Sequence, residues 1–173
     1  QPRSRGLGDV YKRQQMHWST ANYAPWQEWA LLDGLADLYE KGLVKGVGLS
    51  NYGPKRLAKV QKKLTERGIP ITSLQVQYSL LSTYPVTELG LKEICDSAGI
   101  QLIAYSPLAL GLLTGKYTKS GPFPKGIRGG LFRQILPEIQ PLLNTLQEIA
   151  QLRDKTIAQV ALNWCIAKGT IPI

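Results

Sequence analysis

Polar side chains end or interrupt three short apolar runs of this sequence and could together form a small polar cluster. They are Ser50 with Asn51, Gln75 with Gln77, and Tyr105 with Ser106. A buried amide or hydroxyl is costly unless it is hydrogen-bonded, so groups at such places have partners. Each residue on its own is equally well explained as a cap of its own strand. Together, polar groups on an apolar wall have the general form of a ligand pocket.

His17 adds a titratable group near the start of the chain, in the run MHWST of residues 16–20. It is the only histidine of the sequence. A lone histidine is more often a surface residue or a satisfied core residue than a functional one. The residue type alone therefore leaves its role open.

The strand that carries Tyr105 and Ser106 has the clearest local pattern. The apolar run of residues 102–104 continues into these two residues and is stopped by Pro107, which has no N–H to give to a sheet. A short apolar run of this kind predicts a strand that is buried on both faces. Tyr105 and Ser106 then lie at the carboxyl end of the strand, which is where parallel α/β proteins bind ligands.

Helices and strands alternate along the rest of the chain, with a glycine between several helices and the strand that follows. Helices are predicted over residues 26–41, 54–68, 87–98, 137–153 and 157–168, and strands over 44–49, 71–78, 102–106 and 170–173. The glycines at 42, 68, 99 and 169 are of the type that ends a helix in a left-handed turn. Residues 111–130 are predicted to form a long glycine-rich loop, and such loops are functional or disordered.

This repetition predicts an α/β fold with a parallel sheet, either doubly wound or closed as a barrel. The segment of residues 46–51 has glycines at 46 and 48, as a dinucleotide-binding fingerprint requires, but Asn51 stands where the third glycine is needed. The segment also lies within a predicted strand. The pattern therefore favours a barrel.

The composition is that of a soluble globular domain. Hydrophobic residues make up 43% of the 173 residues and charged residues 19%, and no apolar run is long enough to span a membrane. Cys95 and Cys165 lie inside helical patterns without the spacing of a metal or redox motif. They are predicted to be buried free thiols.

The net charge of +9 would suit a nucleic-acid-binding protein, but its distribution indicates otherwise. Residues 1–14, with four basic side chains and one acidic one, show no helical or strand period and resemble a translated sequencing adaptor. We therefore treat 1–14 as a non-native segment and 15–173 as the domain, with a basic arm as the alternative. The basic residues between 55 and 63 are predicted to lie on a solvated helix face without aromatic residues for base stacking, so no nucleic-acid partner is expected.

Several motifs occur in the order found in aldo-keto reductases, and residues 15–173 resemble that family. The motifs are MHW at 16–18, GVGLSNY at 46–52, LQVQYSLL at 74–81, AYSPL at 104–108, LTGKY at 113–117, QVALNW at 159–164 and IPI at 171–173. Each motif is weak alone, and the ordered set carries the resemblance. The run HWST with YAP at 23–25 is similar to plant and cyanobacterial-type members of the family, including pyridoxal reductases.

The resemblance implies an α/β fold that is part of a TIM barrel, the (β/α)8 fold, and roughly its second half, with parallel strands and outer helices. It implies an enzyme that reduces aldehydes or ketones, including pyridoxal-like aldehydes, with NADPH. His17 is then the catalytic donor that polarises the substrate carbonyl. No metal site is expected.

The resemblance also implies which residues bind the cofactor. Ser50, Asn51 and Gln75 would hold the nicotinamide carboxamide, because amides and hydroxyls both donate and accept hydrogen bonds. Tyr105 would stack on the nicotinamide ring, with a strand-end core tyrosine as the alternative. The pyrophosphate would lie along Ser106, Leu108 and Gly111.

The sequence also departs from the family pattern. Of the family's catalytic tetrad of Asp, Tyr, Lys and His, only the histidine has a match, at His17. Tyr11 and Lys12 lie in the excluded segment and are not accepted as substitutes. The basic stretch that binds the adenosine 2′-phosphate in the family has no match up to Ile173. We therefore expect a chain that is truncated at both ends and inactive by itself.

Two other functions stay open on the sequence alone. The same fold serves as the cytoplasmic β subunit of potassium channels, which is a regulatory binding role. A different TIM-barrel enzyme would need strand-end carboxylates or metal ligands. The expected partner is a small carbonyl substrate, no membrane partner is expected, and no oligomeric state is predicted. The expected location is the cytoplasm, or a plastid if the source is a plant or an alga.

Overall fold

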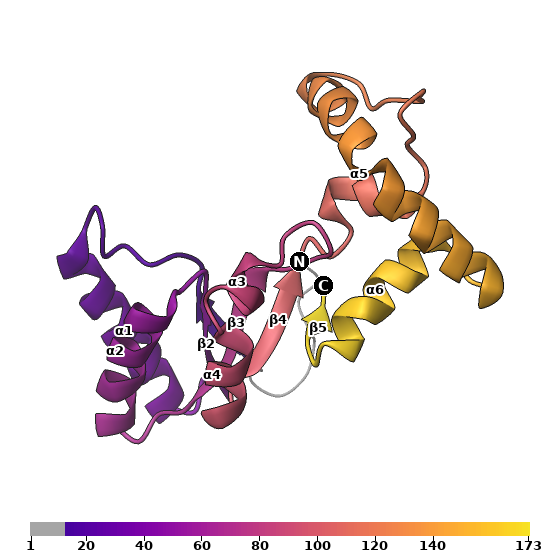
Figure 1. The fold of residues 1–173 in the computed structure, drawn as a ribbon. Helices are drawn as coiled ribbons and strands as arrows, with labels where there is room; N and C mark the ends of the chain where they lie inside the picture. The colour runs from indigo at the N-terminus through magenta and orange to yellow at the C-terminus, as the bar shows by residue number, and fades with distance from the viewer. Residues whose placement is uncertain (1–12) are drawn as a thin grey trace, which may run out of the picture. The chain divides into compact units, whose positions relative to one another are not determined.

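The computed structural model describes residues 13–173, which form two compact units (Figure 1). Unit 1 holds the described residues up to Val76 together with Tyr84–Ile103, and unit 2 holds Gln77–Thr83 together with Ala104–Ile173. Most of the segment predicted to be non-native, residues 1–12, lies outside the described residues. Within residues 13–173, no helix is long and apolar enough to cross a membrane.

Unit 1 is built from strands that alternate with helices. Its elements are β1 (Gln14–Met16), α1 (Pro25–Glu40), β2 (Val47–Ser50), α2 (Pro54–Glu66), β3 (Ile71–Gln77), α3 (Tyr84–Thr87), α4 (Leu91–Ser97) and the start of β4 (Gln101–Tyr105). The strands follow one another in chain order, and β2 pairs in parallel with both β1 and β3. With β5 of unit 2 included, five parallel strands alternate with helices, which confirms the predicted α/β class.

The first residue of β1 belongs to the segment that we excluded from the fold. Gln14 donates its N–H to the carbonyl oxygen of Gly46 at 3.1 Å and pairs in register with Val47. Strand β1 therefore begins at Gln14, one residue before the start of the domain predicted from the sequence.

Both outer helices of unit 1 begin and end as the sequence predicts. Pro25 and Pro54 stand at the first helical position, where a missing N–H costs nothing. Gly42 and Gly68 follow the helices with φ of +67° and +70°, a conformation that glycine adopts without strain. The fully buried apolar side chains at helical spacing are Leu32 and Ala36 in α1 and Leu57, Val60 and Leu64 in α2.

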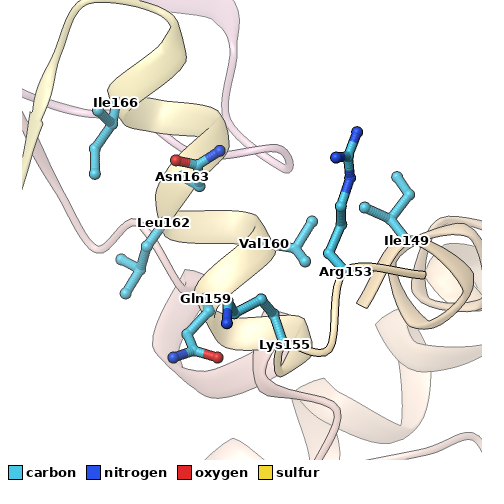
Figure 2. A pocket seen from close by; sticks show the side chains of 8 residues that line it. All are labelled: Ile149, Arg153, Lys155, Gln159, Val160, Leu162, Asn163 and Ile166. Carbon is cyan, nitrogen blue, oxygen red and sulfur yellow. The ribbon is translucent and has the colours of Figure 1, made fainter. Parts of the chain in front are cut away.

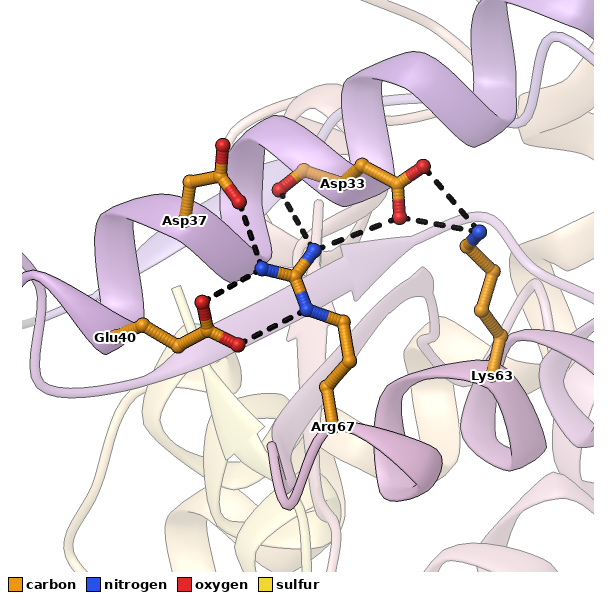
Figure 3. A network of polar contacts seen from close by, with 5 residues as sticks. All are labelled: Asp33, Asp37, Glu40, Lys63 and Arg67. Atoms are coloured by element: carbon orange, nitrogen blue, oxygen red, sulfur yellow. Dashed lines mark hydrogen bonds and ion pairs between the residues drawn. The ribbon is translucent and has the colours of Figure 1, made fainter.

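Charged side chains join the C-terminal parts of α1 and α2, and we call this group the Arg67 network (Figure 3). Arg67 donates to Asp37 at 2.6 Å and to the two carboxylate oxygens of Glu40 at 2.9 and 2.7 Å. Lys63 Nζ lies 3.0 Å from Asp33 Oδ1. The hydrogen bonds from Arg67 lower the pKa of both Asp37 and Glu40. All five side chains are partly exposed, so solvent screens these pairs and each contributes little to stability.

The prediction that the basic residues between 55 and 63 lie on a solvated helix face is wrong for two of them. Arg56 and Lys63 are half-buried, whereas the other basic residues of this stretch are exposed as predicted. Their charged groups lie 4.6 and 5.3 Å from the ring centroid of Trp29 on α1. Contact with α1 therefore removes these two cations from the solvated face.

The helix predicted over residues 87–98 is shorter in the structure, because α4 begins at Leu91 and Gly90 separates it from α3. The φ of Gly90, +60°, is left-handed, and a left-handed residue interrupts the helical hydrogen-bond pattern. In α4, Leu91 is buried, and Cys95 is buried as predicted. Cys95 and Cys165 are both free and buried, which confirms the cysteine prediction. Burial raises the pKa of Cys95 to about 11, so its thiol stays protonated at neutral pH.

Unit 2 contains the end of β4, the short 3-10 helix η1 (Ala109–Thr114), α5 (Ile127–Leu152), α6 (Ile157–Ala167) and β5 (Ile171–Pro172). A capping box begins α6: Gln159 N donates to Thr156 Oγ1 at 3.2 Å, and Thr156 N donates to Gln159 Oε1 at 2.9 Å. Ile173 N donates to the Ala104 carbonyl oxygen at 2.9 Å, which pairs the end of the chain with β4. The core of the unit consists of Leu112, Leu113, Phe132, Leu136, Leu143, Leu146, Ala150, Ile157 and Ala161.

The loop predicted over residues 111–130 is shorter in the structure, and the prediction is wrong at both of its ends. Helix η1 covers its first residues, and α5 begins at Ile127 instead of at residue 137. Pro137 and Pro141 lie inside α5, although proline is the least favourable residue in a helix interior. Phe132 and Leu136 are fully buried in the unit 2 core, and this packing offsets the unfavourable local propensity.

Candidate functional site

In unit 1, the ends of β1 and β2 bring predicted site residues together. Asn51 directly follows β2, and its Nδ2 donates to Ser50 Oγ at 3.0 Å and to the His17 carbonyl oxygen at 3.3 Å. Its backbone N–H donates to the Gln75 carbonyl oxygen at 2.8 Å. One asparagine therefore connects three parallel strands and all four unit 1 candidates.

The backbone of Asn51 adopts the left-handed conformation, with φ of +61°. Residues with a side chain rarely occupy this region, and asparagine is among the few that tolerate it. Such conformations cost about 1–3 kcal/mol and persist where neighbouring contacts hold them, often at functional sites. The contacts of Asn51 with three strands are of this kind.

His17 follows β1 directly, and its side chain is exposed. Its ring centroid lies 5.7 Å from that of Trp18, with the two rings tilted by 46°. The exposure rules out a satisfied core histidine. It leaves the imidazole accessible to a ligand at the carboxyl ends of the strands.

Gln75 lies within β3, in register with Ser50, so it is not at the end of its strand as the sequence pattern indicated. Gln15, on β1, donates from Nε2 to Gln75 Oε1 at 3.0 Å. The Oε1 atom of Gln15 is buried and has no hydrogen-bond partner among the described residues. A buried acceptor of this kind calls for a donor, which a bound ligand can supply.

In unit 2, the predicted site residues lie on one continuous segment that runs from the end of β4 into η1. They are Tyr105, Ser106, Leu108 and Gly111. The Tyr105 carbonyl oxygen accepts from the N–H of Tyr78 at 3.3 Å, and the Ser106 carbonyl oxygen accepts from the N–H of Ala109 at 2.9 Å. These bonds fix the backbone on both sides of the turn out of the strand.

The same segment has an unusual concentration of positive φ angles. Ser106, Ala109, Leu110 and Gly111 have φ of +53°, +48°, +59° and +106°. Three of these residues carry a Cβ, so the segment stores backbone strain of the kind found at ligand sites.

The residue contacts that sequence reasoning missed centre on Glu28, in the first turn of α1. Its side chain is fully buried. Oε1 of Glu28 accepts hydrogen bonds from the hydroxyls of Ser19 at 2.5 Å and Tyr52 at 2.8 Å, and Oε2 forms an ion pair with Arg56 of α2. One signal could have revealed it, because Glu28 lies four residues before Leu32 and so falls within the apolar stripe of α1.

Tyr52 is the residue after Asn51, and only 1% of it is exposed. Burial raises the pKa of Tyr52 to about 12, with a smaller opposing effect from its hydrogen bond with Ser19. The phenol is therefore protonated at neutral pH and remains a donor to Glu28.

A groove in unit 2 is separate from these residues. It has a volume of about 700 Å³ and lies along α6 beside the end of α5 (Figure 2). The residues that line it are Ile149, Arg153, Lys155, Gln159, Val160, Leu162, Asn163 and Ile166. None of the predicted site residues is among them, so the groove is not the site predicted from the sequence.

Comparison with known proteins shows which family this chain is similar to. The family model described as "Aldo/keto reductase family" matches residues 11–173. The chain is 60% identical to the chloroplastic pyridoxal reductase of Arabidopsis thaliana over 159 residues, which are 92% of this chain and 43% of that protein. It is 36% identical to the L-glyceraldehyde 3-phosphate reductase of Escherichia coli K12 over 139 residues, 76% of this chain and 40% of the relative. The chain thus spans less than half the length of these curated relatives.

Solved structures show the same fold. The glycerol dehydrogenase from Gluconobacter oxydans matches with a TM-score of 0.78 at 20% identity, over 95% of this chain and 49% of the other. The match to about half of a TIM-barrel structure confirms the predicted partial barrel. The resemblance drawn from the ordered motifs is confirmed as well, and the chain belongs to the aldo/keto reductase family.

Proposed function

We propose that the whole protein transfers a hydride from NADPH to the carbonyl carbon of an aldehyde or ketone, with a pyridoxal-like aldehyde as substrate. The observation that carries this proposal is the arrangement of Asn51, whose side-chain amide contacts Ser50 and the His17 backbone and whose N–H donates to Gln75 within β3. The 60% identity to a pyridoxal reductase supports the substrate class.

In this proposal His17 is the donor to the substrate carbonyl oxygen. Negative charge develops on that oxygen as the carbonyl is reduced, and a fixed N–H donor stabilises it. A single preorganised donor of this kind contributes on the order of 10²–10³ in rate. The exposed imidazole at the end of β1 meets the requirement that the donor be accessible to a ligand.

The polar groups of unit 1 fit a nicotinamide carboxamide, which has one acceptor and one NH₂ donor. Asn51 and Ser50 offer amide and hydroxyl groups. Gln75 has its Oε1 bonded to Gln15, which directs its amide NH₂ toward acceptors. The buried, unpartnered Oε1 of Gln15 supplies an acceptor beside it. The donor set therefore matches the carboxamide, and NADPH would supply the hydride when bound.

We propose that the strained segment of unit 2, taken by itself, also takes part in binding the dinucleotide, as the family resemblance implies. We assign Tyr105 to stacking on the nicotinamide ring, a contact worth about 0.5–1.5 kcal/mol beyond burial. Its ring would shield one face of the cofactor. We also assign Ser106, Leu108 and Gly111 to the pyrophosphate, because the small residues among them, on a strained backbone, suit the close approach of a phosphate.

The Asp, Tyr and Lys of the family tetrad have no motif match in this chain. We therefore propose that the whole protein supplies them and that the 173-residue chain by itself does not reduce carbonyl compounds. The Arabidopsis relative is chloroplastic by name, which supports a plastid over the cytoplasm as the location.

Replacement of His17 tests the function directly. In the whole protein, His17→Ala should lower kcat for pyridoxal reduction about 10²–10³-fold and leave the NADPH dissociation constant unchanged, because the imidazole acts on the substrate. Asn144→Ala, on an exposed position of α5, is the control. Unchanged kcat in His17→Ala, or a wild type that does not turn over with NADPH, would overturn the proposal.

A further inference from the structure

We propose that Glu28 is a positioning residue, whose buried carboxylate holds the loop that carries His17 and the loop that carries Asn51 in one fixed arrangement. The roles of His17 and Asn51 in this statement rest on the proposed function. The contacts of Glu28 do not depend on it.

The carboxylate contacts the segment after β1, the segment after β2 and the first turn of α2. Ser19, two residues after His17, donates its hydroxyl to Oε1 at 2.5 Å. Tyr52, the residue after Asn51, donates to the same oxygen at 2.8 Å. The other oxygen pairs with Arg56 in the first turn of α2. Each loop therefore has one anchor on Glu28 beside its candidate functional residue.

The two anchored loops also contact each other directly. Asn51 Nδ2 donates to the His17 carbonyl oxygen at 3.3 Å, which is a long and exposed hydrogen bond. A bond of this length is weak by itself. The shorter, charge-assisted bonds to the carboxylate are stronger and directional, so they set the separation that the Asn51–His17 bond requires.

Packing alone does not explain a carboxylate at this position. Glu28 occupies the apolar stripe of α1, where an aliphatic side chain would fill the same space. A buried ion pair is often no more stabilising than well-packed apolar residues, because both charges lose their hydration. The geometry that such a pair specifies is its distinctive contribution. Arg56 is held on its other side by the ring of Trp29, 4.6 Å from its guanidinium carbon.

His17 offers a direct readout, because it is the only histidine in the 173-residue chain. With 15N-labelled histidine, the ring signals in an NMR spectrum of the full chain come from His17 alone. We compare wild type, Glu28→Gln and Glu28→Ala with Val60→Ala, which removes buried volume from α2 at a position outside both loops. Melting temperatures of the same samples report stability.

Glu28→Ala should shift or broaden the His17 ring signals, and Glu28→Gln, which still accepts from Ser19 and Tyr52, should restore part of the wild-type position. Val60→Ala should lower the melting temperature and leave the His17 signals in place. Unmoved His17 signals in a folded Glu28 variant would overturn the proposal, as would an equal shift in Val60→Ala. If Glu28→Ala does not fold, the Glu28→Gln spectrum decides between the same two outcomes.

Failure of the proposed function gives a different result. If NADPH added to the wild-type whole protein is not bound, the reductase assignment fails, yet the His17 signals still report whether Glu28 positions the loop. In a whole protein that binds NADPH, Glu28→Gln should lower kcat more than it raises KM for the carbonyl substrate. A purely structural role would reduce only the amount of folded enzyme.

Discussion

The two ends of the α1–α2 pair both carry charged side chains, but they hold them in opposite environments. Glu28, at the start of α1, is fully buried and has partners on two loops and on α2. In the Arg67 network at the other end, Asp33, Asp37 and Glu40 are each about half exposed (Figure 3). The two helices thus have a buried ion pair at the end beside His17 and Asn51, and exposed ion pairs at the other end.

The exposed ion pairs join the two helices, whereas the buried carboxylate fixes the geometry of the two loops. Exposed ion pairs are screened by solvent and salt and tolerate movement of their long side chains. A buried carboxylate tolerates neither loss of a partner nor a change in geometry. The buried end is the end that adjoins His17 and Asn51, so the rigid interaction lies where a ligand site needs it.

Glu28→Ala should have the largest effect on stability. It leaves Arg56 half-buried without its carboxylate and removes the acceptor of the Tyr52 hydroxyl, and breaking a buried pair costs about 3–5 kcal/mol. Urea denaturation of the full chain measures the loss in the free energy of unfolding. A loss no greater than that of Arg67→Ala would remove the distinction between the two ends.

Alkaline pH should produce an intermediate effect through Tyr52. Its folded pKa of about 12 is above the ordinary value of 10.0, so the protonated phenol stabilises the fold fully below pH 10 and this contribution is lost as the pH rises toward 12. The shift corresponds to about 2–3 kcal/mol.

The variant Tyr52→Phe isolates this contribution. It should be less stable than wild type by about 1 kcal/mol at neutral pH, because the bond to Glu28 is lost. Since phenylalanine does not ionise, only wild type loses stability between pH 10 and 12, so in melting-temperature measurements the difference should shrink and then reverse. Cys95 titrates in both proteins and cancels in the comparison. Parallel pH curves for the two proteins would show that Tyr52 does not stay protonated as described.

Arg67→Ala should have the smallest effect. Arg67 lowers the pKa of Asp37 and Glu40, so its contribution is present above their ordinary values of 3.8 and 4.5 and is lost as the pH falls through the lowered values. The difference in melting temperature from wild type should therefore vanish in acid and in about 1 M salt, where the Debye length is about 3 Å. The loss in Glu28→Ala should persist in the same salt, and a salt-sensitive loss there would contradict its burial.

Elements with strong local signals were predictable from the sequence. The prolines at 25 and 54 and the glycines at 42 and 68 gave the bounds of α1 and α2 to within two residues. The start of α5 was not predictable in this way, because its first turns contain glycines and its interior contains two prolines. Only the burial of Phe132 and Leu136 against distant residues favours the helix there.

The candidate site likewise contains residues that a local sequence signal indicates and residues that only tertiary contacts reveal. Asn51 and Ser50 could be singled out because polar residues end an apolar run, and family motifs gave each candidate a role. Glu28 and Gln15 were missed, because their importance lies in contacts with residues more than eight positions away. A carboxylate in an apolar stripe is the one local sign that such a contact exists.

The affinity of the whole protein for NADPH, measured by fluorescence titration of wild type, Asn51→Ala and Asn144→Ala, tests the central claim most directly. If the strand ends of unit 1 hold the nicotinamide, Asn51→Ala should weaken binding about tenfold, the value of one good hydrogen bond, and Asn144→Ala should bind as wild type does. Equal affinity in all three proteins would show that the cofactor does not lie at Asn51.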